Sequence, residues 1–262
     1  MFDPSRPGTL VVVGTGIALV AHTTLETLDC IKHADRLLYL VTEPATESWL
    51  RQLNGSAETL HDCYAAGRSR LESYGEMVER MLAAVRTGAS VCAAFYGHPG
   101  VFVNPGHEAI RRARREGFQA RMLPAVSTED CLFADLGVDP VDSGCQSYEA
   151  TDFLAYRRRI DPTSALILWQ AGVLGEASVA RRGGGRPQRI ARLTAALRRH
   201  YDARHPVVLY EAAVFPVCRP RIRRVTLANL PKTRIGSMVT LYIPPKPSRA
   251  ADPAVMRWFD EE

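Results

Sequence analysis

Apolar residues occur along this chain in short runs, separated by stretches with helical spacing. In the first half, runs of strand length predict buried strands at residues 9–13, 37–41, 90–95 and 118–123. Apolar side chains every three or four residues predict helices between them: from Thr23 or Thr24 to Ala34, after Glu43-Pro44, in the second half of 64–85, and over 108–115. This alternation of strands and helices is typical of an α/β fold with a largely parallel sheet.

The second half continues the pattern less regularly. Strands are predicted near 165–169, 206–210 and 238–243, with a helix between Gln188 and Tyr201. Pro124 is a plausible hinge between the halves. We therefore expect an N-terminal α/β domain over 1–124, a C-terminal α/β domain over 125–247, and a tail over 248–262.

The tail is rich in proline, and we expect it to be loosely ordered, although Val255, Trp258 and Phe259 are available to dock elsewhere. A second segment, 181–187 (RRGGGRP), should be mobile because three consecutive glycines leave its backbone unrestrained.

The composition is that of an ordinary globular protein, with 262 residues, 46% hydrophobic and 23% charged. A net charge of +5 mildly favours an acidic partner. Arginines cluster at 111–115, 157–159, 181–189 and 219–224. We favour solvated faces over a surface for RNA or an acidic peptide, because no aromatic residues alternate with these arginines as a base-stacking platform requires.

Several classes of protein are disfavoured. No apolar stretch is long enough to cross a bilayer. Gly14-Thr15-Gly16 interrupts the apolar start, which favours a buried strand followed by a turn over a secretion signal. No Cys-x-x-Cys pair or histidine spacing indicates a metal site, so no metal is expected. The six cysteines have apolar or small neighbours, which predicts buried free thiols in a reducing cytoplasm. They are Cys30, Cys63, Cys92, Cys131, Cys145 and Cys218.

Two glycine-containing turns follow predicted strands. Gly14-Thr15-Gly16 lacks the third glycine and the acidic residue of a dinucleotide site, so a tight turn is the better interpretation. The segment 96–102 (YGHPGVF) is a stronger candidate for a ligand loop, because ligands of α/β sheets lie beyond the carboxyl ends of strands. Segments 146–149 and 169–172 also lie near strand ends, where ordinary loop polarity explains them equally well.

The guanidinium of Arg70 follows the phenol of Tyr64 by six residues and precedes the phenol of Tyr74 by four. Such a set can combine a proton acceptor with a group that stabilises an anion. The plain alternative is that Tyr74 packs on a helix face while Arg70 pairs with Glu72 or Glu76 in solvent. The residues alone leave both interpretations open.

Three longer stretches resemble the tetrapyrrole-methylase superfamily of S-adenosylmethionine-dependent methyltransferases: 96–110 (YGHPGVFVNPGHEAI), 125–140 (AVSTEDCLFADLGVDP) and 144–154 (GCQSYEATDFL). Together with the Tyr64, Arg70, Tyr74 spacing, they are most similar to the borosin peptide-backbone α-N-methyltransferases. The resemblance covers residues 9–245. It implies a class III methyltransferase fold, with two α/β domains and a cofactor cleft between them, and a homodimer, or a heterotetramer with two peptides.

The resemblance also implies roles for particular residues. S-adenosylmethionine would be the cofactor and S-adenosylhomocysteine the product. The loop after the third predicted strand would line the methionine and adenosine sites through Tyr96, His98, Val101 and Phe102. Further cofactor contacts would come from the second half of the chain, at Ser127, Gln170, Glu211, Ala212, Val239 and Thr240.

The sequence departs from the superfamily pattern in ways that bear on the acceptor. Gly14-Thr15-Gly16-Ile17 stands where many members have a glycine-proline-glycine-aspartate loop, which counts against a tetrapyrrole. Fused borosin enzymes carry a long extension that ends in their own substrate, whereas this sequence stops soon after its last predicted strand. We therefore expect a separate, ribosomally made precursor peptide. The alternatives are an RNA 2′-O-methyltransferase, a tetrapyrrole C-methyltransferase, or a non-catalytic scaffold that binds cofactor or peptide; a nucleic-acid partner is not favoured.

Methylation of an amide nitrogen is demanding, because its lone pair is delocalised into the carbonyl group. The nitrogen must lose its proton, and negative charge then develops on the carbonyl oxygen, where a preorganised donor stabilises it. Our hypothesis makes Tyr74 or Tyr64 the base, as a phenolate. Arg70 would lower the pKa of that phenol or bind the imidate oxygen, and Tyr96 would orient the amide or the methyl group.

Overall fold

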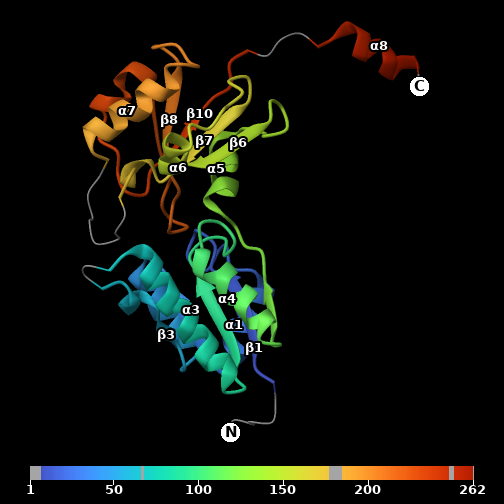
Figure 1. The fold of residues 1–262 in the computed structure, drawn as a ribbon, viewed down its shortest axis with the longest axis vertical. Coiled ribbons are helices and arrows are strands. Elements are labelled where there is room, and N and C mark those ends of the chain that lie inside the picture. Colours follow the sequence, from blue (N-terminus) through green and yellow to red (C-terminus); the bar gives the residue numbers. More distant parts are fainter. Residues whose placement is uncertain (1–6, 66–67, 177–184, 248–250, 262) are drawn as a thin grey trace. The chain divides into compact units, whose positions relative to one another are not determined.

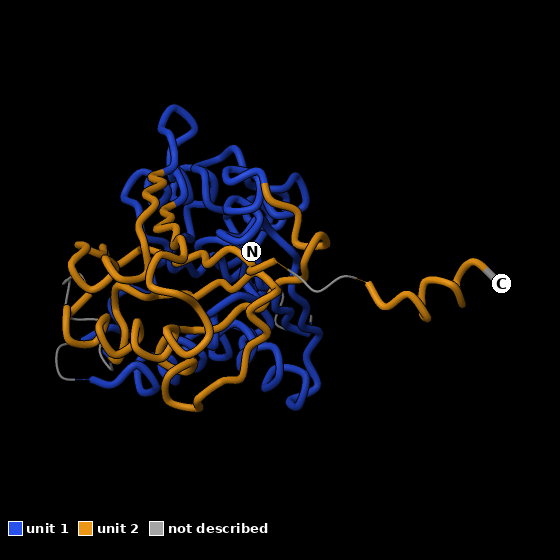
Figure 2. The backbone as a smooth tube through the Cα atoms, turned by 90° about the horizontal axis from the view of Figure 1, so that it is seen from above, with its two compact units in different colours: residues 1–137, 176–182, 212–220 blue, residues 138–175, 183–211, 221–262 orange. Residues whose placement is uncertain are grey.

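The computed structural model describes the chain except for residues 1–6, 66–67, 177–184, 248–250 and 262. Most of the glycine-rich segment expected to be mobile, 181–187, therefore lies outside the described residues. The chain forms two compact units, shown in blue and orange in Figure 2. The first unit comprises residues 1–137, 176–182 and 212–220, and the second comprises 138–175, 183–211 and 221–262.

The first break between units falls after Gly137 instead of at Pro124. Helix α5 (Thr128–Leu136) belongs to the first unit, where Cys131 Sγ lies 4.0 Å from His22 Nδ1. Ser127 therefore belongs to the first unit and not to the second half of the fold. Ala212 also groups with the first unit, because the segment that follows strand β8 returns to it and Leu19 N–H donates to Val214 O at 2.8 Å.

The first unit contains a five-stranded parallel sheet in the order β3-β2-β4-β1-β5. Figure 1 labels β1 and β3 of this sheet. Its strands are β1 (Thr9–Gly14), β2 (Arg36–Leu40), β3 (Glu58–Thr59), β4 (Ser90–Phe95) and β5 (Gln119–Met122). The four strands predicted from apolar runs are confirmed, and the two-residue β3 was not predicted. Phe95 pairs in register with both Gly14 and Leu40, so β1, β2 and β4 end at the same edge.

Helices cover both faces of this sheet. They are α1 (Leu25–His33), α2 (Pro44–Leu53), α3 (Arg70–Arg86) and α4 (Asn104–Arg115). Thr24 caps α1, as the sequence predicted. Alternate residues along β1 point to different cores: Val12 packs with Met77 and Met81 of α3, whereas Val13 packs with residues of α1 and α2. The parallel α/β prediction therefore holds for this unit.

The second unit has a mixed sheet in the order β6-β7-β10-β8-β9. Its strands are β6 (Cys145–Glu149), β7 (Ala165–Trp169), β8 (Pro206–Glu211), β9 (Arg221–Thr226) and β10 (Thr240–Ile243). Only the β6–β7 pairing of this described sheet is parallel, so a largely parallel arrangement was wrong here. The reason is that β10, the last strand in sequence, inserts antiparallel between β7 and β8.

Two short helices, α6 (Ala150–Ala155) and α7 (Pro187–Leu197), complete the core of the second unit. The tail is not irregular, since it contains helix α8 (Pro253–Glu261). Val255, Trp258 and Phe259 of this helix are 45%, 53% and 61% exposed. No helix in the described part of the chain is long and apolar enough to span a bilayer.

The prediction of buried cysteines is correct only for some of them. Cys63 and Cys92 are buried, but Cys218 is exposed because it lies in the loop between β8 and β9. The remaining three are partly buried, and none of the six, all of which lie in the described part of the chain, forms a disulfide.

Candidate active site

Tyr64, Tyr74, Tyr96 and Phe102 line one cavity of about 250 Å³ in the first unit. The cavity lies at the edge of the sheet where β2 and β4 end, since Leu40 and Phe95 also line it. The structure thus brings together residues that are up to 38 positions apart in the sequence. Its volume is below the roughly 300–1,000 Å³ of pockets that enclose a whole drug-sized ligand, so it suits one reacting part of a substrate.

The first turn of α3 positions Arg70 and Tyr74. Ser69 caps this helix: Glu72 N–H donates to Ser69 Oγ at 3.3 Å, and Ser69 N–H donates to a carboxylate oxygen of Glu72 at 2.8 Å. Arg70 and Tyr74 are four residues apart and so project from the same side of the helix. Tyr64 follows the 3₁₀ turn η1 (His61–Cys63), and its ring lies edge-on to that of Tyr74, with 6.4 Å between centroids.

Electrostatics favour the protonated form of two of these phenols. Burial raises the pKa of Tyr64 well above its usual value, and the neighbouring Tyr74 acts in the same direction. The charge of Arg70 lowers that pKa but does not offset the burial. Burial likewise raises the pKa of Tyr96 to about 12. At neutral pH both phenols are therefore hydrogen-bond donors, which disfavours Tyr64 as the base, and the choice between Tyr64 and Tyr74 stays a prediction.

Arg70 does not pair in the way that the plain alternative requires. Glu72 belongs to the capping box, and Glu76 forms an ion pair with Arg68. Arg70 Nε is buried and has no hydrogen-bond partner among the described residues. As the first residue of α3, Arg70 also places a cation where the helix dipole disfavours it. A buried donor without a partner, beside two phenols, is suited to stabilising a negative charge on a ligand.

The loop after β4 is held by the turn after β1. Gly16 and Gly97 exchange backbone hydrogen bonds at 3.0 and 3.3 Å, and a Cβ at Gly14 would lie 2.1 Å from the carbonyl oxygen of Gly97. The glycine turn therefore acts as the partner of the candidate ligand loop. Within that loop, His98 Nδ1 accepts a hydrogen bond from Gly100 N–H at 2.9 Å.

Phe102 has a φ of 58°, in the left-handed region that non-glycine residues seldom adopt. Such strain persists only where the surroundings enforce it, and it clusters at ligand sites. Val101 and Phe102 are 37% and 47% exposed, so both side chains are accessible to a ligand.

A second group of predicted residues gathers at one edge of the sheet of the second unit. Thr240 pairs in register with Tyr210, so the start of β10 lies beside the end of β8, where Glu211 is found. Gln170 directly follows β7 and has a φ of 55°, again left-handed. Val239 is buried and precedes Thr240 at the same edge.

Glu211 and Ser127 both have partners within the protein. A carboxylate oxygen of Glu211 lies 3.5 Å from the guanidinium of Arg221. Ser127 caps α5, accepting hydrogen bonds from Glu129 N–H and Asp130 N–H at 3.1 and 3.2 Å. The cap by itself accounts for a serine at position 127, so its contact with a cofactor stays a prediction.

Sequence reasoning missed His61, which lines the cavity with its ring centroid 5.7 Å from that of Tyr64. The available signal was its position three residues before Tyr64, which one helical turn brings close. Within the ranges that the structure describes, no three His, Cys, Asp or Glu side chains form a group that could hold a metal.

Comparison with known proteins places this geometry in a family. The model of the family "Tetrapyrrole (Corrin/Porphyrin) Methylases" matches residues 9–231. The Thermus thermophilus uroporphyrin-III-C-methyltransferase structure matches 91% of this chain and 93% of its own, with a TM-score of 0.65 and 19% identity. The cobalt precorrin-4 methyltransferase structure gives 0.64 and 17%, covering 90% of this chain and 94% of its own. At such identities, the likeness shows the fold.

Sequence relatives are closer. The methyltransferase/dendrothelin A cyclic peptide precursor of Dendrothele bispora is 43% identical over 98% of this chain and 62% of its own length. The omphalotin A precursor of Omphalotus olearius is 42% identical over 97% and 61%. A type I borosin precursor of Coprinopsis marcescibilis is 42% identical over 92% and 63%. This chain spans about three fifths of the length of these relatives. Because the family match covers most of both units and the solved structures share the fold, the chain belongs to the tetrapyrrole (corrin/porphyrin) methylase family.

Proposed function

We propose that this protein is an S-adenosylmethionine-dependent methyltransferase that acts on backbone amide nitrogens of a ribosomally made peptide. The observation that carries the proposal is the buried Arg70 Nε, which has no partner among the described residues and whose charge acts on Tyr64. Tyr64 lines a cavity together with Tyr74 and Tyr96, and Arg70 itself is not part of that lining. The names of the relatives, which join a methyltransferase to a cyclic peptide precursor, support a peptide as the acceptor.

Each residue of the cavity has a distinct task in this proposal. Tyr74 accepts the amide proton, since the raised pKa of Tyr64 removes that phenol as a ready base. Arg70 donates to the carbonyl oxygen as the imidate charge develops there. Tyr96, protonated at neutral pH, donates a hydrogen bond that orients the amide. The apolar walls, Phe95 and Phe102 among them, exclude water and strengthen these interactions.

When bound, S-adenosylmethionine supplies an electrophilic methyl group, and S-adenosylhomocysteine is the product. The residues present fit such a cofactor, because the strained loop at Phe102 follows a parallel strand, where α/β folds bind ligands. We assign cofactor contacts to Tyr96, His98, Val101, Phe102 and Ser127 in the first unit. The group in the second unit, with Gln170, Glu211, Val239 and Thr240, is assigned further contacts, as is Ala212.

The form of the substrate stays a prediction. The relatives join methyltransferase and precursor in one polypeptide, and this chain spans only part of their length. A separate precursor peptide, a homodimer or a heterotetramer with two peptides, and a cytoplasmic location are therefore expectations to be tested.

The test is co-expression with a candidate precursor peptide, followed by tandem mass spectrometry. We expect methyl-sized mass increments on backbone nitrogens. Tyr74→Phe should abolish them while calorimetry still detects cofactor binding; Tyr156→Phe, at an exposed tyrosine of the second unit, is the matched control. An unmodified peptide beside demonstrated cofactor binding would contradict the peptide acceptor, and RNA and tetrapyrroles would be tested next.

A further inference from the structure

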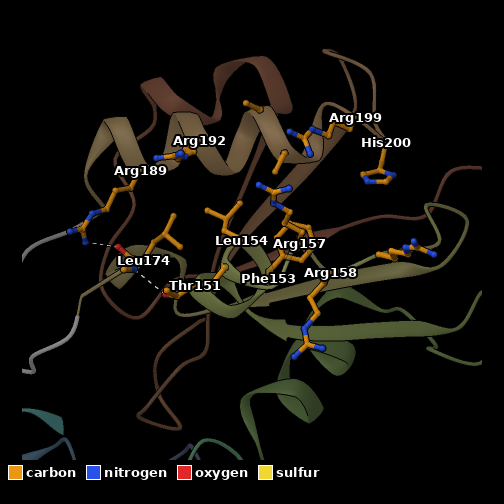
Figure 3. A pocket seen from close by; sticks show the side chains of 15 residues that line it. Thr151, Phe153, Leu154, Arg157, Arg158, Leu174, Arg189, Arg192, Arg199 and His200 are labelled. Atoms are coloured by element: carbon orange, nitrogen blue, oxygen red, sulfur yellow. Dashed lines mark hydrogen bonds between the residues drawn. The ribbon is translucent and has the colours of Figure 1, made fainter. Parts of the chain in front are cut away.

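A groove of about 890 Å³ lies between α6 and α7 in the second unit, and none of the residues assigned to chemistry lines it (Figure 3). Its walls are apolar, with Phe153 and Leu154 from α6 and Leu174 from the loop after β7. Figure 3 shows Arg192 and Arg199 on the α7 side. The run 157–159, which follows α6, adds three more arginines to the lining.

Five arginines of this groove differ from those of the first unit in their pairing: Arg192, Arg199 and the run 157–159. On α4, Arg111 pairs with Glu108 and Arg112 with Glu79. Among the described residues, no carboxylate lies within ion-pair distance of these five arginines. They therefore concentrate positive charge at the groove, and an acidic ligand would relieve their mutual repulsion.

The apolar walls decide which kind of acidic ligand fits. A nucleic-acid strand binds basic surfaces through exposed aromatic platforms, whereas this groove offers a phenylalanine buried in the core, a leucine and alanines. A lining of apolar floor and cationic rim is complementary to an amphipathic helix that carries carboxylates beside its apolar face.

Helix α8 has that composition. Val255, Trp258 and Phe259 are spaced three and four residues apart, so they form one apolar face, and all three are exposed. Residues 252–262 contain Asp252, Asp260, Glu261 and Glu262 against a single arginine. An exposed apolar face on a helix calls for a surface to pack against.

The chain that leads to α8 starts at the rim of the groove. Lys246 Nζ donates to the carbonyl oxygen of His200, a residue that lines the groove, at 3.0 Å. Lys246 N–H also donates to Pro162 O at 2.8 Å, which anchors this point a second time. The residues from there to Pro253 span at most roughly 25 Å when extended, enough to return a helix about 14 Å long along the groove.

We propose that α8 docks into the arginine groove of its own chain, with Trp258 and Phe259 on the apolar floor and its carboxylates facing the arginine rim. The occupant is thus an acidic amphipathic helix supplied in cis. Docking covers the exposed aromatic pair, whose ring centroids lie 5.1 Å apart.

Hydrogen–deuterium exchange of the full chain tests the proposal. We expect the amides of 255–260 to exchange at least about tenfold more slowly than those of the free peptide 251–262. Arg158→Glu and Arg192→Glu together should remove that protection. Arg115→Glu, at an exposed arginine of α4, is the control that changes charge elsewhere. It should leave exchange in α8 unchanged.

A second readout does not depend on how well the groove variant folds. Trp258 is exposed in the undocked helix, whereas Trp169 is buried and Trp49 is partly buried. The part of the acrylamide quenching of tryptophan fluorescence that disappears in Trp258→Phe therefore reports on α8. We expect Trp258 to be shielded from acrylamide. Because docking within one chain does not depend on protein concentration, the shielding should stay the same when the protein is diluted about a hundredfold. Unprotected amides, an accessible Trp258, or shielding that fades on dilution would overturn docking in cis.

Discussion

Replacing Arg70 by alanine separates catalysis from stability in this fold. In most sites, removing a partly buried arginine breaks an ion pair and destabilises the protein. Here the two nearby carboxylates are already engaged, Glu72 in the capping box and Glu76 with Arg68, and Arg70 Nε has no partner among the described residues. Little of the folding free energy therefore depends on this guanidinium.

The magnitudes follow from that geometry. Without a broken ion pair, the change in the free energy of unfolding should stay within about 0.5 kcal/mol. Removing a cation from the first position of α3 should return about 0.3–1 kcal/mol through the helix dipole. Arg70→Ala should therefore be as stable as the parent or slightly more stable. If Arg70 stabilises the imidate, kcat should fall about 10²–10³-fold, which corresponds to about 2.7–4 kcal/mol of barrier.

The assay pairs thermal unfolding with methylation followed by mass spectrometry, at saturating cofactor and peptide. Arg80→Ala is the matched control, because Arg80 lies on the same helix and pairs with Asp62 at 2.6 Å and Glu58 at 3.8 Å. It should lose up to about 1 kcal/mol of stability and keep its turnover. An Arg70→Ala enzyme with near-normal kcat would refute the assignment, as would one that loses stability in step with activity.

Three further predictions concern positioning, close packing and alkaline pH. Ser69→Ala removes the cap of α3 and should lower the unfolding free energy by about 1 kcal/mol, whereas Ser69→Asp should retain it, by chemical denaturation. Gly172→Ala puts a Cβ 1.8 Å from the carbonyl oxygen of Gly236, and should destabilise by about 1–3 kcal/mol and weaken cofactor binding in calorimetry. Burial raises the pKa of Tyr201 from 10.0 to about 12, so the buried neutral phenol contributes its full share of the unfolding free energy below pH 10, and about 2 kcal/mol of that free energy should be lost by pH 12.

Each of these has a result that would count against it. A Ser69→Ala protein with unchanged stability would show that the capping box does not hold the first turn. A Gly172→Ala protein with normal cofactor affinity would remove Gln170 and its neighbours from the site. Tyr201→Phe should flatten the alkaline loss of stability, and an unchanged pH profile in that variant would assign the loss to other groups.

The sequence predicted the elements that are apolar and buried on both faces. Strands β1, β4 and β7 read as continuous apolar runs because helices or loops cover each side. Strands β6 and β9 were missed because they lie at the edges of the second sheet, where polar and charged side chains are tolerated. The antiparallel direction of β10 could not be predicted either, since it depends on pairing with β7 and β8, far away in the sequence.

The sequence predicted which residues belong to the candidate site better than it predicted the pKa values of those residues. The spacing of Tyr64, Arg70 and Tyr74 indicated that they belong together, and two of them line the same cavity. The charge of Arg70 lowers the pKa of Tyr64, as the sequence indicated, but burial outweighs that charge, and burial is a property of the folded chain. The arginine run 157–159 was interpreted as a solvated face, and its three side chains are exposed. That the run lines a groove was not predicted, because the α7 wall of the groove lies far away in the sequence.

The hydrogen bond from Leu19 to Val214 has a consequence for synthesis on the ribosome. All five strands of the first sheet lie within residues 9–122, so this sheet is able to assemble before the segment around Val214 has been made. Leu19 acquires this partner only when Val214 has emerged. From residue 122 to residue 214, at about 5–20 residues per second, the delay is roughly five to twenty seconds. During this interval the nascent chain presents a formed sheet while Leu19 still lacks its hydrogen bond to Val214.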